Sequence, residues 1–109
     1  MIRESDIERY LLRALRDYKC HVRKLRFVGH RGAPDRAIMR DGKTFYVELK
    51  APGKKVPAYQ AREHERLRDV GQTVVVIDSF EAVDQFVREY INGEKKKAKR
   101  AGSNLRLSR

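Results

Sequence analysis

Three residues with reactive side chains lie on two neighbouring segments that otherwise have the apolar pattern of strands. Asp35 opens the segment "DRAIMR", and Glu48 and Lys50 interrupt the segment "TFYVELK". Side chains two residues apart on a strand share a face, so Glu48 and Lys50 are expected side by side, with the alternate apolar residues facing the core. The Asp41-Gly42 turn signal between the segments predicts a hairpin. Its register brings Asp35 opposite Glu48.

This arrangement of charges suits a divalent metal ion. Two carboxylates at adjacent strand ends repel one another unless a cation lies between them, and hard oxygen ligands favour Mg²⁺ or Mn²⁺. The backbone carbonyl of Leu49 offers a further oxygen ligand. The ammonium of Lys50 can orient or help deprotonate a water, or offset phosphate charge, and phosphodiester hydrolysis needs these parts. The alternative is a plain Glu48–Lys50 ion pair on an exposed sheet face, which contributes only about 0.2–1 kcal/mol.

The charge of the chain favours a polyanionic partner. Its 109 residues include 26 Lys or Arg and 15 Asp or Glu, which gives a formal net charge of +11. Such a balance favours nucleic acid or, as a weaker alternative, an anionic membrane surface, and no apolar run is long enough to predict a membrane span. The charged first ten residues do not fit a secretory signal, and the single Cys20 favours a reducing compartment. We therefore expect a cytoplasmic protein or, if it is encoded by a phage, one that acts in the host cytoplasm.

Hydrophobic periodicity predicts one α/β domain over residues 1–93. Ser5 and Glu8 fit a capping box at the start of the first helix. The apolar segment "TVVVI" predicts a strand covered on both faces and parallel to the strand before it. The expected order is α-β-β-β-α-β-α, with a mixed central sheet flanked by helices. The expected helices cover residues 5–18, 58–70 and 79 onward, and the expected strands cover residues 21–29, 35–40, 44–50 and 73–77.

The composition changes after residue 93. Residues 94–109 carry seven Lys or Arg against one Glu and few apolar side chains. We expect this segment to be a mobile basic arm that contacts phosphates, or else a plain solvated terminus. The remaining 93 residues still carry a net positive charge.

The motifs together resemble a known group of nucleases. Pro34-Asp35 followed by Glu48-Leu49-Lys50 resembles the signature of the PD-(D/E)xK superfamily, and "RGAPD", "YVELKAPG" and Gln60 are similar to the VRR-NUC family over roughly residues 4–77. The resemblance implies a restriction-endonuclease-like fold and a Mg²⁺- or Mn²⁺-dependent endodeoxyribonuclease. It also implies that Asp35, Glu48 and the Leu49 carbonyl bind the metal and that Lys50 is the catalytic lysine.

The resemblance extends to two further positions. Gln60 matches a glutamine that approaches the active centre, although a surface or core-edge amide is the alternative. The family carries an acid on its first helix, for which Glu4 and Glu8 are both candidates. The capping box accounts for Glu8, and Glu4 is followed at three residues by apolar Ile7, so Glu4 is the expected ligand. His64 shares a helical face with Gln60 and is expected to pack or to contact phosphate rather than bind metal.

Basic residues near the acidic motif are expected to position phosphates without reading bases. Stand-alone domains of this kind resemble Holliday-junction resolvases, which implies a homodimer that cuts branched DNA. The competing hypothesis is a non-catalytic DNA-binding module that retains the fold and the charge. The expected nucleic-acid contacts are Arg23, Lys24, Arg26, His30, Arg31, Lys54 and Lys55.

Overall fold

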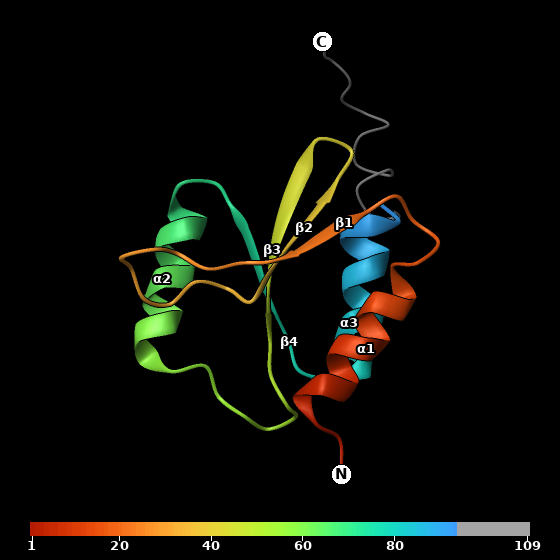
Figure 1. The fold of residues 1–109 in the computed structure, drawn as a ribbon, viewed down its shortest axis with the longest axis horizontal. Helices are drawn as coiled ribbons and strands as arrows, with labels where there is room; N and C mark the ends of the chain where they lie inside the picture. Colours follow the sequence, from red (N-terminus) through yellow and green to blue (C-terminus); the bar gives the residue numbers. More distant parts are fainter. Residues whose placement is uncertain (94–109) are drawn as a thin grey trace.

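A computed structural model describes residues 1–93, which form a four-stranded sheet with helices on both sides (Figure 1). The predicted basic arm, residues 94–109, lies outside the described residues. The elements, in chain order, are α1 (Glu4–Ala14), β1 (His21–Lys24), β2 (Arg36–Arg40), β3 (Lys43–Leu49), α2 (Ala58–Asp69), β4 (Thr73–Ile77), α3 (Phe80–Phe86) and the π-helix η1 (Val87–Ile91).

The sheet is mixed, as the sequence predicts. The strand order is β1-β2-β3-β4, with antiparallel pairing from β1 to β3 and parallel pairing between β3 and β4. Helix α2 lies on one side of the sheet, whereas α1 and α3 lie on the other (Figure 1). None of the helices in residues 1–93 is long and apolar enough to cross a membrane.

The β2–β3 hairpin has the register that its turn predicts. Asp41 and Gly42 both have positive φ, 52° and 77°, which is the backbone of the tight turn that Asp-Gly favours. Arg36 pairs with Val47 across the hairpin. Asp35 is therefore set at the open end of the hairpin, one step beyond the last pair.

The core fills the space between the sheet and the α1–α3 layer. Alternate residues of β3 face it, and Phe45 meets Phe86 edge to face with ring centroids 6.0 Å apart. Burying one such side chain contributes roughly 1.5–3 kcal/mol, so this layer holds the sheet rigid beneath the polar residues of its other face. The core consists of Ile7, Leu11, Leu15, Ile38, Phe45, Val47, Leu49, Ile77, Val83, Phe86 and Ile91.

The strand expected over residues 21–29 is shorter than predicted. Strand β1 ends at Lys24, and one further bond joins the Leu25 N–H to the Asp35 carbonyl at 2.9 Å. Beyond Leu25 the chain leaves the sheet, and residues 26–34 form a loop that crosses to α2 (Figure 1).

The first helix also differs from its prediction. It ends at Ala14, and Leu15 and Tyr18 pack against the core from a turn that follows it. The capping box of Ser5 and Glu8 is wrong: the cap residue is Arg3, whose backbone N–H donates to Asp6 Oδ2 at 2.8 Å. By contrast, Ser79 caps α3 as predicted, with its Oγ accepting from the Ala82 N–H at 2.9 Å.

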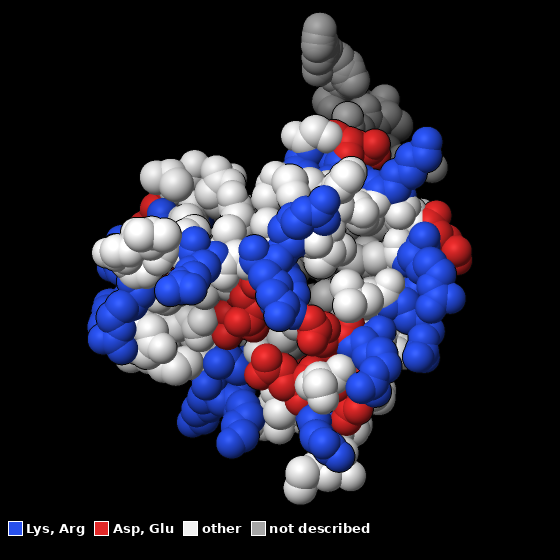
Figure 2. Space-filling model, viewed as in Figure 1, with Lys and Arg blue, Asp and Glu red and all other residues white. Residues whose placement is uncertain are grey.

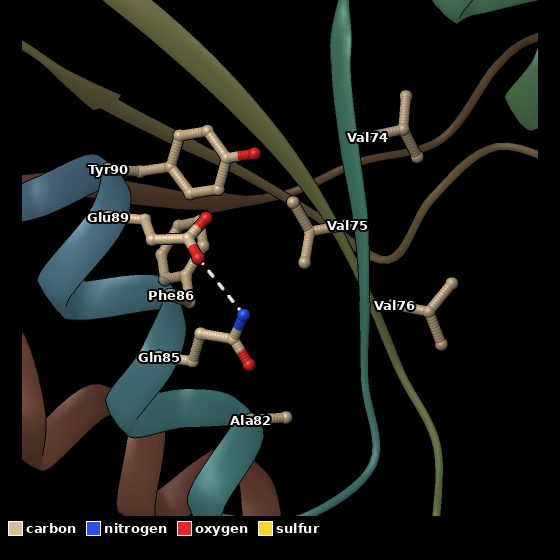
Figure 3. A pocket seen from close by; sticks show the side chains of 8 residues that line it. All are labelled: Val74, Val75, Val76, Ala82, Gln85, Phe86, Glu89 and Tyr90. Atoms are coloured by element: carbon tan, nitrogen blue, oxygen red, sulfur yellow. Dashed lines mark hydrogen bonds between the residues drawn. The ribbon is translucent and has the colours of Figure 1, made fainter. Parts of the chain in front are cut away.

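Strand β4 lies at the sheet edge, and it has buried residues on both faces, as predicted: Ile77 belongs to the core, and Val74, on the opposite face, is 6% exposed. Val75 points toward Phe86 and Tyr90, whereas its strand neighbours point away from them (Figure 3). A groove of about 380 Å³ runs along this edge between β4 and the α3–η1 segment. On its helical wall, Gln85 Nε2 donates to Glu89 Oε2 at 3.0 Å (Figure 3).

Candidate active site

The hairpin brings together the three reactive residues that the sequence singled out. Asp35 Oδ2 accepts a hydrogen bond from the Leu49 N–H at 2.9 Å, which ties the start of β2 to the end of β3. Lys50 Nζ lies 3.3 Å from Glu48 Oε2. The Lys50 N–H donates to the Ile77 carbonyl at 3.0 Å, so β4 fixes the backbone on the other side. We call Asp35, Glu48 and Lys50 the acidic centre.

Glu48 differs from the exposed ion-pair partner of the alternative hypothesis. Its side chain is only 3% exposed, and its Oε1 atom is buried without a hydrogen-bond partner among residues 1–93. Burial and the nearby charge of Asp35 raise the pKa of Glu48, while Lys50 and Gln60 oppose the rise. A buried carboxylate oxygen without a partner is unfavourable, so this position calls for a cation or a proton.

The ligand set fits a hard divalent ion that keeps part of its water shell. In the part of the chain that the structure describes, no three His, Cys, Asp or Glu side chains form a metal-binding group. A metal would therefore depend on the two carboxylates, a backbone carbonyl and water. Mg²⁺ commonly binds in this way, through one or two carboxylates and several waters.

Helix α2 covers the acidic centre. Gln60 is 8% exposed, and its Nε2 donates to the Ala33 carbonyl at 3.3 Å, beside the start of β2. His64, one turn later, is 2% exposed, and its Nε2 has no hydrogen-bond partner within residues 1–93. Burial and the charge of Arg68 lower the pKa of His64, which favours the neutral ring. Two buried polar side chains on one face of α2 thus cover the acidic centre.

Comparison with known proteins identifies the group to which this chain belongs. No family model matches it. A protein named "Putative nuclease p44", from Acyrthosiphon pisum secondary endosymbiont phage 1, is 44% identical over 80 residues, which are 72% of this chain and 86% of that protein. A solved structure described as a VRR_NUC domain matches with a TM-score of 0.74 and 34% identity, over 83% of this chain and 99% of that one. The chain belongs to the VRR_NUC nuclease family.

These two matches confirm the family and the α/β fold that the sequence predicted. They also give the general reaction class of this VRR_NUC protein, which is hydrolysis of phosphodiester bonds in nucleic acid.

The structure changes the comparison between the two candidate acids of the first helix, Glu4 and Glu8. Glu8 forms an ion pair with Arg36, and Arg36 also donates to the Asp35 carbonyl at 3.2 Å. Glu4 is exposed, one turn earlier on α1. The capping box that favoured Glu4 over Glu8 is absent, so that reason is lost. Both acids stay candidates, and Glu8 is the one in contact with β2.

The predicted phosphate contacts are all exposed, and they come from two sides of the acidic centre. Figure 2 shows acidic side chains gathered between α2 and α1, with basic side chains on both flanks. Arg23 lies along β1, where its Nη1 donates to the Val22 carbonyl at 3.0 Å. The other members in this region are Lys24 and Arg26 from β1 and the segment after it, and Lys54 and Lys55 from the loop after Lys50.

The remaining two contacts, His30 and Arg31, lie against α2. His30 Nε2 is 2.8 Å from Glu63 Oε1, and the Arg31 guanidinium stacks over the Tyr59 ring at 4.0 Å. The sequence interpretation missed Glu63 and its partner Arg66. Their spacing on α2 was visible, but charges on a helix usually face solvent, and only the fold shows that a loop covers this face.

Proposed function

We propose that this VRR_NUC protein is a Mg²⁺- or Mn²⁺-dependent endonuclease that cleaves branched DNA. The observation that supports it best is the buried Glu48 Oε1, which lacks a hydrogen-bond partner within residues 1–93 and lies beside a second carboxylate. A structural ion pair would not leave that oxygen unsatisfied. A divalent cation would satisfy it and relieve the repulsion from Asp35.

Asp35, Glu48 and the Leu49 carbonyl would hold the metal. The Asp35–Leu49 hydrogen bond fixes these groups relative to one another, because it locks the two strand ends together. When bound, the ion supplies Lewis acidity to a phosphate and lowers the pKa of a coordinated water. Glu8 or Glu4 from α1 would complete the acidic surroundings.

Lys50 would act on the substrate directly. Its side chain is 20% exposed, whereas that of Glu48 is 3% exposed, so the ammonium is anchored by the carboxylate and still reaches solvent. From this position it would orient the attacking water or offset charge on the phosphate. Gln60, held by the Ala33 carbonyl, would orient groups at the same centre from the α2 side.

The substrate assignment depends on charge and symmetry. The exposed basic residues on both flanks of the centre would contact backbone phosphates, which gives affinity without sequence readout. We propose a homodimer as the active form, because two equivalent centres related by a two-fold axis match the symmetry of a four-way junction. Light scattering coupled to size-exclusion chromatography would measure this assembly state.

A cleavage assay tests the proposal. The full chain is incubated with a four-way junction, a flap and a linear duplex of matched sequence, each with Mn²⁺, with Mg²⁺ or with EDTA. We expect metal-dependent internal cleavage that is fastest on the junction and absent in EDTA. Cleavage that persists in EDTA would contradict the metal assignment, and equal rates on all three substrates would contradict the selectivity for branches.

Asp35→Asn supplies a matched variant for this assay. The amide oxygen can still accept the hydrogen bond from the Leu49 N–H, so the hairpin end is retained while the negative charge is lost. We expect DNA binding in EDTA to be retained and cleavage to be lost. A non-catalytic DNA-binding module would instead show no cleavage by the unaltered protein under any of the metal conditions.

A further inference from the structure

A second polar site lies beside the acidic centre, on the outer face of α2. The loop between β1 and β2 crosses to this helix and forms a pocket of about 390 Å³ with it (Figure 1). Three arginines, one histidine and one aromatic ring form the pocket, which we call the arginine pocket. Its walls are Gly29, His30, Arg31, Tyr59, Arg62 and Arg66.

A buried carboxylate positions two of these side chains. Glu63 is 7% exposed, and its Oε1 accepts from Arg66 Nε at 2.9 Å and lies 2.8 Å from His30 Nε2. Burial alone would raise the pKa of Glu63, but His30 and Arg66 outweigh it, so this pKa is lowered. Arg66 uses only Nε in this bond. Both terminal nitrogens of its guanidinium therefore remain available to a ligand.

The loop is held against the helix by close packing as well as by charge. Gly32 has a φ of +95°, and a Cβ atom at this position would lie 2.9 Å from Glu63 Cβ and 3.3 Å from Gln60 Cα. Only glycine allows this approach. Together with the Arg31–Tyr59 stack at 4.0 Å, this contact makes the pocket a preformed feature rather than a chance gathering of side chains.

The pocket carries excess positive charge. Glu63 is the carboxylate that binds its cations, whereas three arginines line it. Among residues 1–93, the exposed Arg62 has no hydrogen-bond or ion-pair partner for its side chain. A planar guanidinium that is exposed and unpaired is well suited to bind a phosphate through two parallel hydrogen bonds.

We propose that the arginine pocket binds a backbone phosphate of the nucleic-acid substrate, at a position away from the bond that is cleaved. This inference rests on the proposed function only for one point, namely that the ligand is nucleic acid. The two sites share one helix: Tyr59, Arg62, Glu63 and Arg66 form one stripe of α2, while Gln60 and His64 on the adjacent stripe cover the acidic centre. One DNA strand that follows α2 would therefore contact both sites.

Binding in EDTA tests the pocket without reference to cleavage. The anisotropy of a fluorescein-labelled DNA duplex is measured against the full chain across a range of NaCl concentrations. Arg62→Gln is expected to weaken binding by roughly tenfold and to reduce the salt slope by about one. Arg62→Lys keeps the charge and should retain most of that slope. The double variant Arg31→Gln/Arg62→Gln should bind more weakly still.

Arg88→Gln is the matched control, because it removes the same charge from an exposed position on η1, in the helical layer on the other side of the sheet from α2. It should bind DNA as the unaltered protein does. If Arg62→Gln and Arg88→Gln have equal effects, only overall charge matters and the pocket proposal fails. Sodium phosphate should displace the duplex more effectively than NaCl of equal ionic strength, and this excess displacement should be lost in Arg62→Gln; an equal excess in Arg62→Gln would contradict the pocket.

The pocket and the proposed function can fail separately. If the unaltered protein cleaves no DNA with any metal but Arg62→Gln still binds tenfold more weakly than Arg88→Gln, the pocket stands and the proposed endonuclease activity does not. If cleavage is metal-dependent and Arg62→Gln binds and cleaves like the control, the activity stands and the pocket proposal fails.

Discussion

Two buried glutamates, Glu48 on β3 and Glu63 on α2, have opposite electrostatic surroundings although both lie on the α2 side of the sheet. The pKa of Glu48 is raised by burial and by Asp35, and one of its oxygens has no partner among residues 1–93. The pKa of Glu63 is lowered, because His30 and Arg66 outweigh its burial. The first carboxylate is only partly compensated, by Lys50, whereas His30 and Arg66 both bind the second.

The difference separates a site that needs a cation from one that presents cations. At the acidic centre, Lys50 offsets only part of the charge of two carboxylates, so a divalent ion would be stabilised there. At the arginine pocket, one carboxylate organises His30 and Arg66 and leaves Arg62 free for an anion. Under these proposals the same residue type would serve two functions, and its neighbours would decide which one it performs.

The largest effect is expected from Glu48→Gln compared with Glu63→Gln. Loss of Glu48 should reduce metal-dependent cleavage by roughly a thousandfold, because a charged ligand of the metal is removed. Glu63→Gln should keep metal-dependent cleavage, since Glu63 serves DNA binding. Initial rates on a four-way junction at saturating protein would measure both variants.

Thermal unfolding provides the control for this comparison. Ligand at a hundred times its dissociation constant stabilises a protein by about 2.7 kcal/mol, so Mn²⁺ should raise the melting temperature of the unaltered protein and of Glu63→Gln. Glu48→Gln should show no such rise, and its metal-free form should be at least as stable as the unaltered protein. A Mn²⁺ shift that survives in Glu48→Gln would contradict the assignment of Glu48 as a ligand.

The next effect concerns Lys50 and separates metal binding from chemistry. Lys50→Ala should slow cleavage by roughly a hundredfold, as is typical when a positioned group that assists proton transfer is lost. The stabilisation by Mn²⁺ should persist in this variant, because both carboxylates remain. Turnover equal to that of the unaltered protein would exclude Lys50 from the reaction.

The sequence allowed the acidic centre to be located because local rules determine it. The Asp41-Gly42 turn sets the register of the hairpin, and strand alternation sets Glu48 beside Lys50. The burial of Glu48 was not predictable in the same way. It depends on α2, which reaches this position only after the chain has formed the β3–α2–β4 connection, so an exposed ion pair stayed an open alternative.

The errors in the fold prediction have a similar origin. The apolar spacing of the first segment continues through Leu15 and Tyr18, but these residues reach the core from a turn. The periodicity therefore predicted which residues pack against the core, but it did not predict where the helix ends. Strand β1 stops at Lys24, where the chain leaves the sheet and its following loop packs against α2. The sequence predicted His30 and Arg31 of the arginine pocket but missed its helical side. The Tyr59–Arg66 stripe has the composition of a solvated helix face, and nothing local shows that Gly32 brings a loop onto it.

A smaller effect is expected from Glu63→Gln on DNA binding and stability. Loss of the charge weakens the hold on His30 and Arg66, so affinity for DNA in EDTA should fall by about threefold and the free energy of unfolding by about 1–2 kcal/mol. Because the folded pKa of Glu63 is lowered, its contribution is complete above the ordinary value of 4.5 and is lost as the pH falls below it. Urea titrations at pH 7 and pH 4 should show this loss in the unaltered protein, and Glu63→Gln should lack it.

The smallest effect concerns His64, which lies on α2 between the two sites. Its pKa is lowered by burial, by Arg68 and by Lys50, while Glu63 and Asp35 act in the opposite direction. The unfolded chain therefore binds a proton at a higher pH than the folded protein does, so stability should fall as the pH drops below the ordinary value of 6.5. One such group contributes a slope of at most about 1.4 kcal/mol per pH unit.

His64→Leu tests this explanation because leucine fills a similar space and removes the buried Nε2, which has no partner within residues 1–93. In EDTA, the unaltered protein should lose stability between pH 7 and pH 5.5, and His64→Leu should lose less. His21→Asn, at an exposed position on β1, is the control for removal of a histidine. Equal slopes in His64→Leu and the unaltered protein would mean that protonation of His64 does not lower the stability of the folded protein. The acidic centre would then already supply enough negative charge to hold a cation on its α2 side.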